Sequence, residues 1–331
     1  MNLPAGPSVS VVIPTHQRPG LVLAAVRSAL EQTLRELEVI VVVDGRDPET
    51  RTALEGVTDA RLIVHVPERH LGNADARNAG VGLARAPWIA FLDDDDTWLP
   101  TKLDRQLAVA QRAACPFPIV SCRLIVRDAL GDRLWPRRLP GQGEHWSEYF
   151  FCRQTPFTGE GMVILSALLV ARDLLIQLPF TSGLDRHVDP DWLLRAGQLP
   201  GTCLEFVPGA DPLVIWHVED SRSRITTRRD WRTSWTWCRS NRRLFSPRGY
   251  AAFVLHVVGS SAAAQHAWRA FPLLLHDAFS HGRPSAVDLA SHLANFGLPA
   301  TLQRRIAAWY GRAAARRPEP GSAPPLPRAP A

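Results

Sequence analysis

The sequence predicts an α/β protein in which a mostly parallel sheet is flanked by helices and followed by a helical C-terminal region. Apolar, strand-like runs alternate with helix-like segments along the first 130 residues. The strand-like runs are apolar almost without interruption, which is typical of strands buried on both faces of a parallel sheet. Beyond residue 230 the composition shifts to Ala, Leu, Arg and Trp at helical spacing. With 331 residues, of which 46% are hydrophobic, the chain is long enough to bury such a core.

Five apolar runs are expected to form the first strands, and they span residues 9–13, 38–43, 60–66, 88–92 and 118–126. Apolar residues at helical spacing predict helices between these strands, over residues 19–32, 73–86 and 100–114. Pro19 stands near the start of the first of these helices, where a missing backbone N–H is tolerated. Two glycines weaken the pattern of the second helix. The alternation places a parallel sheet at the centre of the first half.

The second half of the chain follows a less regular pattern. Residues 161–175 are expected to run from a strand into a helix, a further helix begins near Asp189, and residues 211–221 give a late strand. Residues 229–317 are expected to form a helical region. The Pro-rich segment 318–331 is expected to be a disordered tail, because it has too few apolar residues to bury.

The formal net charge is +6, with a pI of about 9.5. A positive net charge permits weak attraction to anionic partners such as nucleic acid or anionic lipid. The stretches over 231–243 and 304–317 do not resemble a nucleic-acid-binding module, and no nucleic-acid partner is expected. Trp231, Trp235 and Trp237 lie among arginines, a composition that suits a membrane interface. Two alternatives stay open for this region: packing on the rest of the protein, or peripheral contact with a membrane.

The five cysteines are scattered and form no C-x-x-C pair. This pattern argues against a disulfide framework and a zinc knuckle, and it suits a reducing cytoplasm. The N-terminus has no basic region followed by a long apolar stretch, so no signal peptide is expected. The longest apolar stretches fall short of the roughly 18 to 20 residues that cross a bilayer, so no transmembrane helix is expected.

Four consecutive aspartates, Asp93 to Asp96, follow the strand predicted over residues 88–92. Polar stretches also follow the first two predicted strands, and in a parallel sheet these three loops should meet at one edge. In extended geometry Asp93 and Asp95 point to the same side, where their carboxylates could hold a hard divalent cation. A plain acidic turn is the alternative. A calcium loop is disfavoured, because its spaced ligands and closing Glu are absent.

Several segments together resemble the N-terminal domain of the family 2 glycosyltransferases, which are nucleotide-sugar enzymes of the GT-A fold. The matching segments are VSVVIPTHQRPGLVLAAVRSALEQT, LEVIVVVDG and GNADARNAGVGLARAPWIAFLDDDDTWLPTKLDRQL. The similarity is strong over residues 9–107 and looser to about Ser223. The resemblance implies an N-terminal extension over 1–8 and a GT-A domain over 9–228, divided into a Rossmann-like nucleotide-binding half over about 9–128 and an acceptor half over about 129–228.

The resemblance also implies which residues bind the nucleotide-sugar, carried over position by position. They are Pro14, Thr15, Arg18, Asp44, Arg77, Asp93 and Asp94. Asp44 matches an aspartate that hydrogen-bonds the base, and Val43 stands where the family often has another aspartate. Arg77 matches an arginine near the base and the diphosphate, with a solvated helix arginine as the alternative. Either Asp93 or Asp94 is expected to face the ribose.

The acidic cluster matches the D-x-D motif of the family. This makes Asp95 the expected direct ligand of a divalent metal, Mn²⁺ or Mg²⁺, while Asp96 is expected to fix the following turn. His217 resembles a late histidine that many members place near the metal and diphosphate, and its neutral ring could supply a nitrogen ligand. A structural role is the alternative for His217.

A general base is also required, because an acceptor hydroxyl is a poor nucleophile until its proton can leave. The segment RHVDPDWLLR resembles the later acidic motif of the family and places Asp189 at the catalytic aspartate. Val188 stands where a glutamate is usual. Asp191 is the competing choice, and helix capping is the structural alternative for Asp189.

The resemblance therefore implies an inverting glycosyltransferase that uses a nucleotide-sugar donor and a hydroxyl acceptor, either a saccharide, a lipid-linked molecule or another alcohol. Synthesis of a cell-surface polysaccharide or glycoconjugate is the expected setting. A catalytically degenerate domain that only binds a nucleotide-sugar, or scaffolds a polysaccharide assembly, is the alternative. A nucleotidylyltransferase and a dinucleotide-dependent oxidoreductase are disfavoured, because the first predicted strand is followed by neither a Gly-rich basic loop nor G-x-G-x-x-G. The expected location is cytoplasmic, at most peripheral at the inner face of the membrane.

Overall fold

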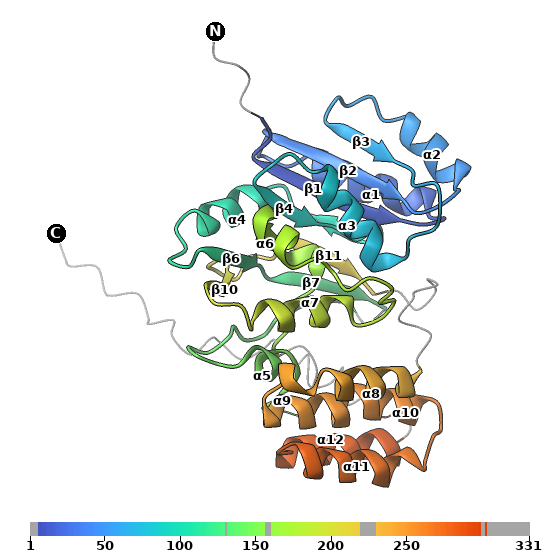
Figure 1. Ribbon diagram of the computed structural model, residues 1–331, viewed down its shortest axis with the longest axis vertical. Helices are drawn as coiled ribbons and strands as arrows, with labels where there is room; N and C mark the ends of the chain where they lie inside the picture. The colour runs from blue at the N-terminus through green and yellow to red at the C-terminus, as the bar shows by residue number, and fades with distance from the viewer. Residues whose placement is uncertain (1–5, 130, 156–159, 219–229, 299–301, 303–331) are drawn as a thin grey trace, which may run out of the picture.

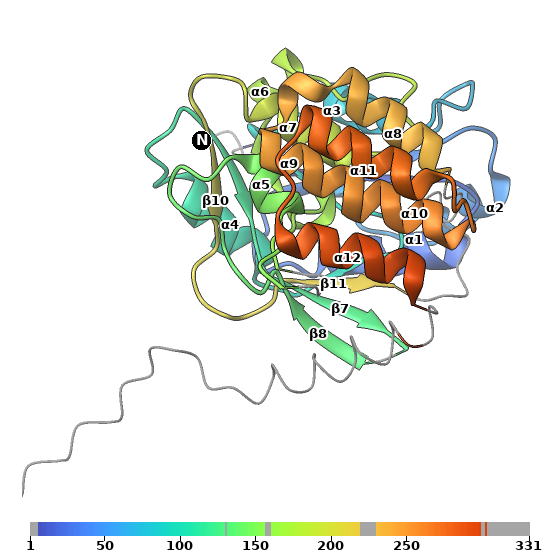
Figure 2. The same ribbon diagram turned by 90° about the horizontal axis from the view of Figure 1, so that it is seen from below.

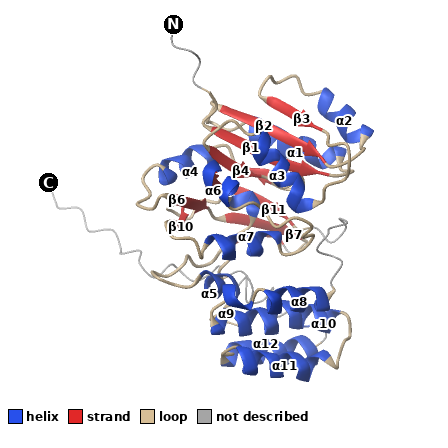
Figure 3. Ribbon diagram, in the orientation of Figure 1, coloured by secondary structure: helices blue, strands red, loops and turns tan. Residues whose placement is uncertain are grey.

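The computed structural model describes residues 6–129, 131–155, 160–218, 230–298 and 302. Figure 1 shows two parts, a twisted sheet with helices against it and a bundle of C-terminal helices beside it. Figure 3 shows that the strands are confined to the first part. The predicted tail over 318–331, the N-terminal residues 1–5 and the last part of the predicted helical region lie outside the described residues.

A seven-stranded sheet forms the centre of the first part. Its strands are β1 (Val9–Thr15), β2 (Leu37–Val43), β3 (Leu62–His65), β4 (Trp88–Phe91), β6 (Phe117–Ser121), β9 (Leu169–Ala171) and β10 (Thr202–Phe206). They lie in the order β10-β6-β9-β4-β1-β2-β3. Neighbouring strands are parallel, except that β9 is antiparallel to both β4 and β6. The prediction of a mostly parallel sheet is confirmed.

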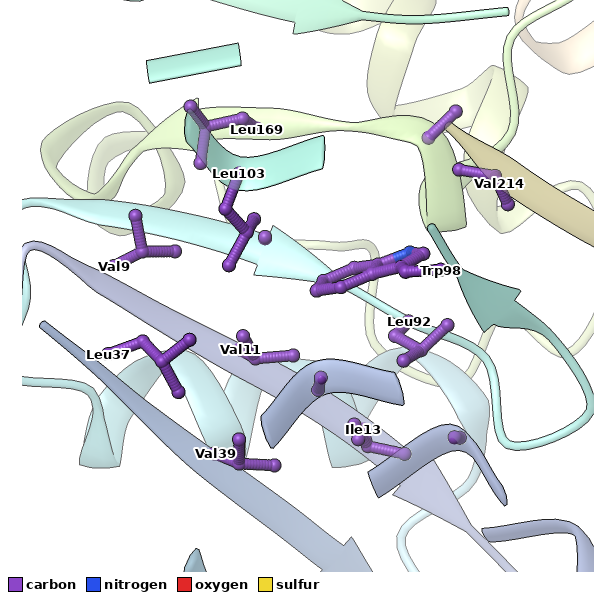
Figure 4. Close-up of a cluster of buried hydrophobic side chains, with 14 of the residues drawn as sticks. Val9, Val11, Ile13, Leu37, Val39, Leu92, Trp98, Leu103, Leu169 and Val214 are labelled. Atoms are coloured by element: carbon purple, nitrogen blue, oxygen red, sulfur yellow. The ribbon is translucent and has the colours of Figure 1, made fainter. Parts of the chain in front are cut away.

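Helices pack on both faces of this sheet. They are α1 (Pro19–Leu30), α2 (Pro48–Glu55), α3 (Asn73–Leu83), α4 (Lys102–Ala110), α6 (Arg172–Gln177) and α7 (Val188–Ala196). Alternate residues of a strand point to opposite sides, so side chains of β1 are buried in two hydrophobic clusters, one on each face of the sheet. Val11 and Ile13 belong to a buried cluster that also contains residues of α1 and α4, and Figure 4 labels Val11, Ile13 and Leu103 of α4 within this cluster. Val12 packs in a second cluster with α3, α6 and α7. The spacing did not predict α2, which buries only Thr50 and Leu54.

A second sheet of four strands lies beside the first. It contains β5 (Thr97–Trp98), β7 (Leu124–Asp128), β8 (Gly131–Trp135) and β11 (Val214–His217), in the order β5-β11-β7-β8. The prediction of one strand over residues 118–126 is wrong, because the chain leaves the large sheet after Ser121 and enters the small sheet at Leu124. Both halves of the run are mostly buried, so hydrophobicity alone does not reveal the change of sheet.

The C-terminal helices form a bundle around an aromatic core. They are α8 (Trp231–Ser240), α9 (Pro247–Ala252), α10 (Gly259–Ala264), α11 (Ala270–His281) and α12 (Ala286–Gly297), with a π-helical segment at Phe253–Val258. Phe253 packs edge-on against Phe151 of α5 (Trp146–Phe151), with ring centroids 4.9 Å apart. This contact attaches the bundle to the sheet-containing part. The helices of the bundle confirm the prediction of a helical C-terminal region.

The aromatic residues of α8 favour packing on the rest of the protein as the role of this helix. Trp231 and Trp237 are buried in the core of the bundle, and the indole N–H of Trp235 is hydrogen-bonded inside it. The structure therefore places these three side chains in helix packing. Among the described residues, no helix is both long enough and apolar enough to cross a membrane.

The expectation of no disulfide framework is wrong for one pair of cysteines, because Cys115 and Cys203 are disulfide-bonded. Cys115 stands just before β6, and Cys203 lies in the neighbouring parallel strand β10. The pairing of these strands joins two residues that are 88 positions apart, which sequence spacing cannot show. Cys122, Cys152 and Cys238 are free thiols. The scattered cysteines therefore no longer support a reducing compartment.

We expect Cys203→Ser to lower the free energy of unfolding by about 2–4 kcal/mol, because a disulfide that closes a long loop restricts the unfolded chain. Urea unfolding without reductant measures this difference. In dithiothreitol, which opens the bond in the wild type, the two proteins should unfold at similar urea concentrations. Equal midpoints in the absence of reductant would show that the disulfide does not stabilise the fold.

Candidate active site

The candidate site lies at the carboxyl edge of the large sheet, where the loops after β1, β2 and β4 meet. The strand register aligns Thr15, the last residue of β1, with Val43, the last residue of β2. The carbonyl oxygen of Thr15 accepts a hydrogen bond from the Asp44 amide at 2.8 Å. The Thr15 hydroxyl donates to the Asp94 carboxylate, also at 2.8 Å. One threonine thus connects the three loops that the sequence places at this edge.

Asp94 is buried and tied to the loop after β1. Its carboxylate accepts a hydrogen bond from Nη1 of Arg18 at 2.9 Å, and the same nitrogen lies 3.5 Å from Oδ2 of Asp95. Burial raises the pKa of Asp94 to about 6, although the Arg18 charge and the Thr15 hydroxyl act in the opposite direction. Pro14 is half-buried and precedes Thr15 in β1.

Arg77 of α3 is buried and forms an ion pair with Asp93. Its Nη1 also donates to the carbonyl oxygen of Asn73, one turn earlier in the helix, at 3.0 Å. Its buried Nε makes no hydrogen bond within the described part of the chain. Arg77 is therefore not a solvent-exposed helix arginine. Its positive charge lies next to Asp93 of the acidic cluster.

Three carboxylates of the cluster converge. Asp93, Asp95 and Asp96 each offer one oxygen, and these oxygens all lie within 4.8 Å of one another. Burial, and after it the charges of Asp93 and Asp95, holds the pKa of Asp96 well above its usual range. Carboxylate oxygens are the donors that Mg²⁺ and Mn²⁺ prefer, and a cation would offset this repulsion. The donor set therefore fits the metal that the sequence predicts.

Ser166 connects the acidic cluster to the short 3₁₀ helix at Leu165–Ala167. Its hydroxyl donates to Oδ2 of Asp96 at 2.6 Å and accepts from the Asp93 amide at 3.1 Å. Asp96 also closes a turn through its own amide, which donates to the Asp93 carbonyl oxygen at 3.1 Å. These contacts favour the turn-fixing role predicted for Asp96, and they show that Ser166 holds the cluster in place.

Asp189 lies in the first turn of α7 and is half-buried beside the cluster. The Leu165 amide donates to its Oδ2 at 3.1 Å. Burial raises the pKa of Asp189 to about 6, the charge of Asp93 adds to the effect, and the Arg77 charge opposes it. Asp189, Asp93 and Arg77 are therefore electrostatic neighbours at the same edge of the sheet.

Asp191 is buried and has other partners, although it is only two residues further along α7. Its carboxylate accepts hydrogen bonds from Thr181 Oγ1 at 2.7 Å, Arg195 Nε at 2.9 Å and Trp237 Nε1 at 3.1 Å. These contacts join α7 to the preceding loop and to the helical bundle. They favour a structural role for Asp191 and leave Asp189 as the better candidate for the base.

Asp44 is buried at the same edge and holds the turn that leads into α3. Its Oδ1 accepts from the Leu71 amide at 2.6 Å, and its Oδ2 accepts from the Gly72 amide at 2.9 Å. His70 Nδ1 lies 3.0 Å from Oδ2. Gly72 has a φ of 88°, which glycine adopts more readily than other residues. If Asp44 contacts a nucleotide base, its carboxylate must accept that hydrogen bond in addition to those from the Leu71 and Gly72 amides.

His217 ends β11 and touches the site through its backbone. Its amide lies 3.3 Å from Oδ1 of Asp96, and its Nε2 lies 3.3 Å from Thr97 Oγ1. Among the described residues, the carboxylates that converge are those of Asp93, Asp95 and Asp96, and the His217 ring does not belong to this group. Metal ligation by His217 stays a prediction.

Comparison with known proteins identifies the family. A family model described as glycosyl transferase family 2 matches residues 10–177, half of the chain. The chain belongs to glycosyltransferase family 2. Similar proteins include the amylovoran biosynthesis glycosyltransferase AmsB of Erwinia amylovora, which is 28% identical over 64% of this chain and 70% of that protein. The glucosyltransferase WfaP of Escherichia coli, whose name gives GlcNAc-diphosphoundecaprenol as acceptor, is 34% identical over 30% of this chain and 39% of WfaP.

Solved structures of Staphylococcus aureus TarS share the fold of this glycosyltransferase. The structure of TarS 1–349 aligns with a TM-score of 0.50 at 15% identity and covers 91% of this chain and 77% of TarS 1–349. Its complex with UDP-GlcNAc aligns with the same TM-score and identity and covers 79% of that protein. At this identity the likeness establishes the fold. It confirms the predicted class, a sheet flanked by helices with a helical C-terminal region.

The sequence of this glycosyltransferase gave no sign of Ser166 or of the Leu165 amide. Both lie in a segment expected to run from a strand into a helix, and neither carries a charge. Their role depends on β9, which inserts antiparallel between β4 and β6 and so brings the preceding 3₁₀ helix to the acidic cluster. Ser166 stands three residues before the first residue of β9, a position that does not distinguish it from other serines in the sequence.

We expect Asp191→Asn to lower the free energy of unfolding by about 1–3 kcal/mol, because it weakens hydrogen bonds to Thr181, Arg195 and Trp237. Asp189→Asn, the matched change two residues away, should leave stability at neutral pH unchanged or slightly higher, because the fold disfavours the Asp189 charge. Thermal and urea unfolding of both variants measure the difference. A larger loss for Asp189→Asn than for Asp191→Asn would reverse the two assignments.

Proposed function

We propose that this protein is an inverting, metal-dependent glycosyltransferase that transfers a sugar from a nucleoside-diphosphate sugar to an acceptor hydroxyl. One observation carries the proposal: the converging carboxylates of Asp93, Asp95 and Asp96 lie beside a separate, half-buried carboxylate, Asp189. The first group suits a cation and the second suits a proton acceptor. Family membership and the names of the relatives support the class of reaction.

The acidic group would hold Mg²⁺ or Mn²⁺ through Asp95, with Asp93 and Asp96 within reach. When bound, the cation supplies charge neutralisation at the leaving nucleoside diphosphate. Arg18 and Arg77 add fixed positive charges to the same region, which favour the anionic donor and the charge that develops as it departs. The nitrogens of both side chains are already oriented by aspartates, so little reorganisation is needed.

Donor binding is proposed to use the loops after β1 and β2. Pro14 and Thr15 would line the nucleotide pocket, and Asp44 would place the base through its remaining acceptor capacity. The Asp93 side chain is 36% exposed and that of Asp94 is 8% exposed, so Asp93 is the better candidate for the ribose contact. Asp94 is proposed to keep the β1 loop and Arg18 in place.

Asp189 is proposed to be the general base. It would take the proton of the acceptor hydroxyl as the oxygen attacks the anomeric carbon from the face opposite the diphosphate. One C–O bond forms, the bond to the diphosphate breaks, and the bond electrons leave with the phosphate oxygen. A carboxylate with a pKa of about 6 is ionised at neutral pH and is more basic than an ordinary aspartate, and both properties suit this role.

A UDP-sugar donor and a polysaccharide precursor as acceptor are the proposed substrates. The TarS complex with UDP-GlcNAc supports a UDP-sugar, and the names of AmsB and WfaP support a saccharide or lipid-linked acceptor. A cytoplasmic location would give access to nucleotide-sugars. The alternative, a degenerate domain that binds a donor without transferring it, predicts binding with no turnover.

We expect Asp95→Ala to weaken Mn²⁺-dependent binding of UDP-sugars at least tenfold, because it removes the proposed ligand. Asp189→Asn should retain binding within a few-fold and lose transfer by about 10²–10⁴-fold. Calorimetry with a panel of UDP-sugars and a turnover assay measure the two effects. Asp173→Asn, an exposed change on α6, is the control. Full turnover by Asp189→Asn would place the base elsewhere.

We expect kcat/KM to fall about tenfold per pH unit below about pH 6, as the Asp189 carboxylate becomes protonated. The pKa of Asp94 is also raised to about 6, so donor binding must be measured over the same range. Binding that persists while transfer falls assigns the loss to Asp189. An unchanged rate down to pH 5 would exclude Asp189 as the base.

A further inference from the structure

The outer surface of the helical bundle carries an unusual concentration of exposed apolar side chains. Six of the twelve large hydrophobic residues that are exposed in the described part of the chain lie between residues 268 and 302. Five of them define the α11–α12 face: Trp268 (59% exposed), Leu273 (41%), Phe279 (58%), Leu293 (60%) and Leu298 (38%). Figure 2, which views the molecule from below, shows α11 and α12 toward the viewer.

The exposed residues follow from the helical period. On α11 the exposed side repeats through Leu273, His276 and Phe279, while Leu274 and Ala278 on the other side are buried in the aromatic core. On α12 the exposed positions are Ala286, Ala290, Leu293 and Gly297. The exposed side of α12 therefore carries no polar side chain, while that of α11 combines Leu273 and Phe279 with His276, Ser280 and His281.

The charges of the α11–α12 face are of one sign. The acidic residues of α11 and α12, Asp277 and Asp288, are buried, and they are hydrogen-bonded to Tyr250 and His256. Arg269 and Arg283 are exposed next to the two ends of α11. Arg269 and Arg283 thus flank α11 in the chain, and the described parts of α11 and α12 carry no exposed carboxylate.

The segment that follows α12 in the sequence is also basic and contains aromatic residues. Residues 303–317 contain five arginines together with Trp309 and Tyr310, and they contain no acidic residue. Charge complementarity therefore disfavours two occupants of the face. The segment 303–317 would bring positive charge toward Arg269 and Arg283, and a second copy of the face would offer these arginines no exposed carboxylate.

We propose that the α11–α12 face docks on an anionic phospholipid surface. Apolar side chains that enter the boundary between headgroups and acyl chains, with arginines near acidic headgroups, are the two components of interfacial binding. The binding does not rest on the proposed function. If that function holds, docking would keep the active site near lipid-linked acceptors. The tryptophans of α8, which pack in the bundle, would take no part.

Co-sedimentation of the full chain with vesicles tests the proposal. We expect at least tenfold stronger binding to phosphatidylcholine vesicles that contain 30% phosphatidylglycerol than to phosphatidylcholine alone, with weaker binding in high salt. The double variant Phe279→Glu/Leu293→Glu should lose at least tenfold in binding to the anionic vesicles. Ile176→Glu changes a side chain of similar exposure (53%) on α6 and should bind like the wild type.

An unfolding midpoint close to that of the wild type would establish that the double variant is folded. UDP-sugar binding is measured separately for both proteins, so that a failure of the proposed function is not mistaken for a failure of vesicle binding. Wild-type binding by the double variant would overturn the proposal and assign the contact to other basic residues. Equal binding to neutral and anionic vesicles would also overturn it. A wild-type dimer that the double variant converts to a monomer, without vesicle binding by either, would identify the face as a self-association surface.

Discussion

Electrostatic repulsion among the carboxylates that follow β4 is the constraint on which the rest of the site depends. Four adjacent aspartates at a buried edge are costly unless positive charge and hydrogen-bond donors surround them. The structure supplies both: Arg18 and Arg77 face the cluster, and the hydroxyls of Thr15 and Ser166 donate to it. The donors come from three parts of the chain, the end of β1 with its loop, α3 and the 3₁₀ helix before β9, so the acidic cluster connects these three parts at one edge.

The same edge separates two kinds of carboxylate. Asp93, Asp95 and Asp96 converge, so their charges favour a cation. Asp189 stands apart in the first turn of α7, where burial raises its pKa, and its hydrogen bond comes from the Leu165 amide rather than from a cationic side chain. The two kinds are coupled electrostatically, because the charge of Asp93 raises the pKa of Asp189 and that of Arg77 lowers it. The two proposed roles, metal binding and proton acceptance, can thus belong to separate carboxylates in one small region.

The local pattern predicted the strands that carry the site, because each is a short apolar run that ends in polar residues. It could not predict contacts made by β9, β6 and β10, since these depend on strands that pair across 50 or more residues. Ser166 and the Cys115–Cys203 bond belong to this class. The resemblance placed Asp189 at the catalytic position, with Asp191 as the competing choice. The partners that distinguish the two residues lie on other elements, including Trp237, and the sequence does not show them.

We propose that the acidic cluster and Asp189 form one reaction centre around a metal-bound donor. Anomalous diffraction from crystals grown with Mn²⁺ and a UDP-sugar tests this most directly. The account predicts a manganese peak at the Asp95 carboxylate, with the anomeric carbon of the sugar between that ion and Asp189. A manganese peak away from Asp93–Asp96, or a sugar bound on the far side of the sheet from Asp189, would contradict it.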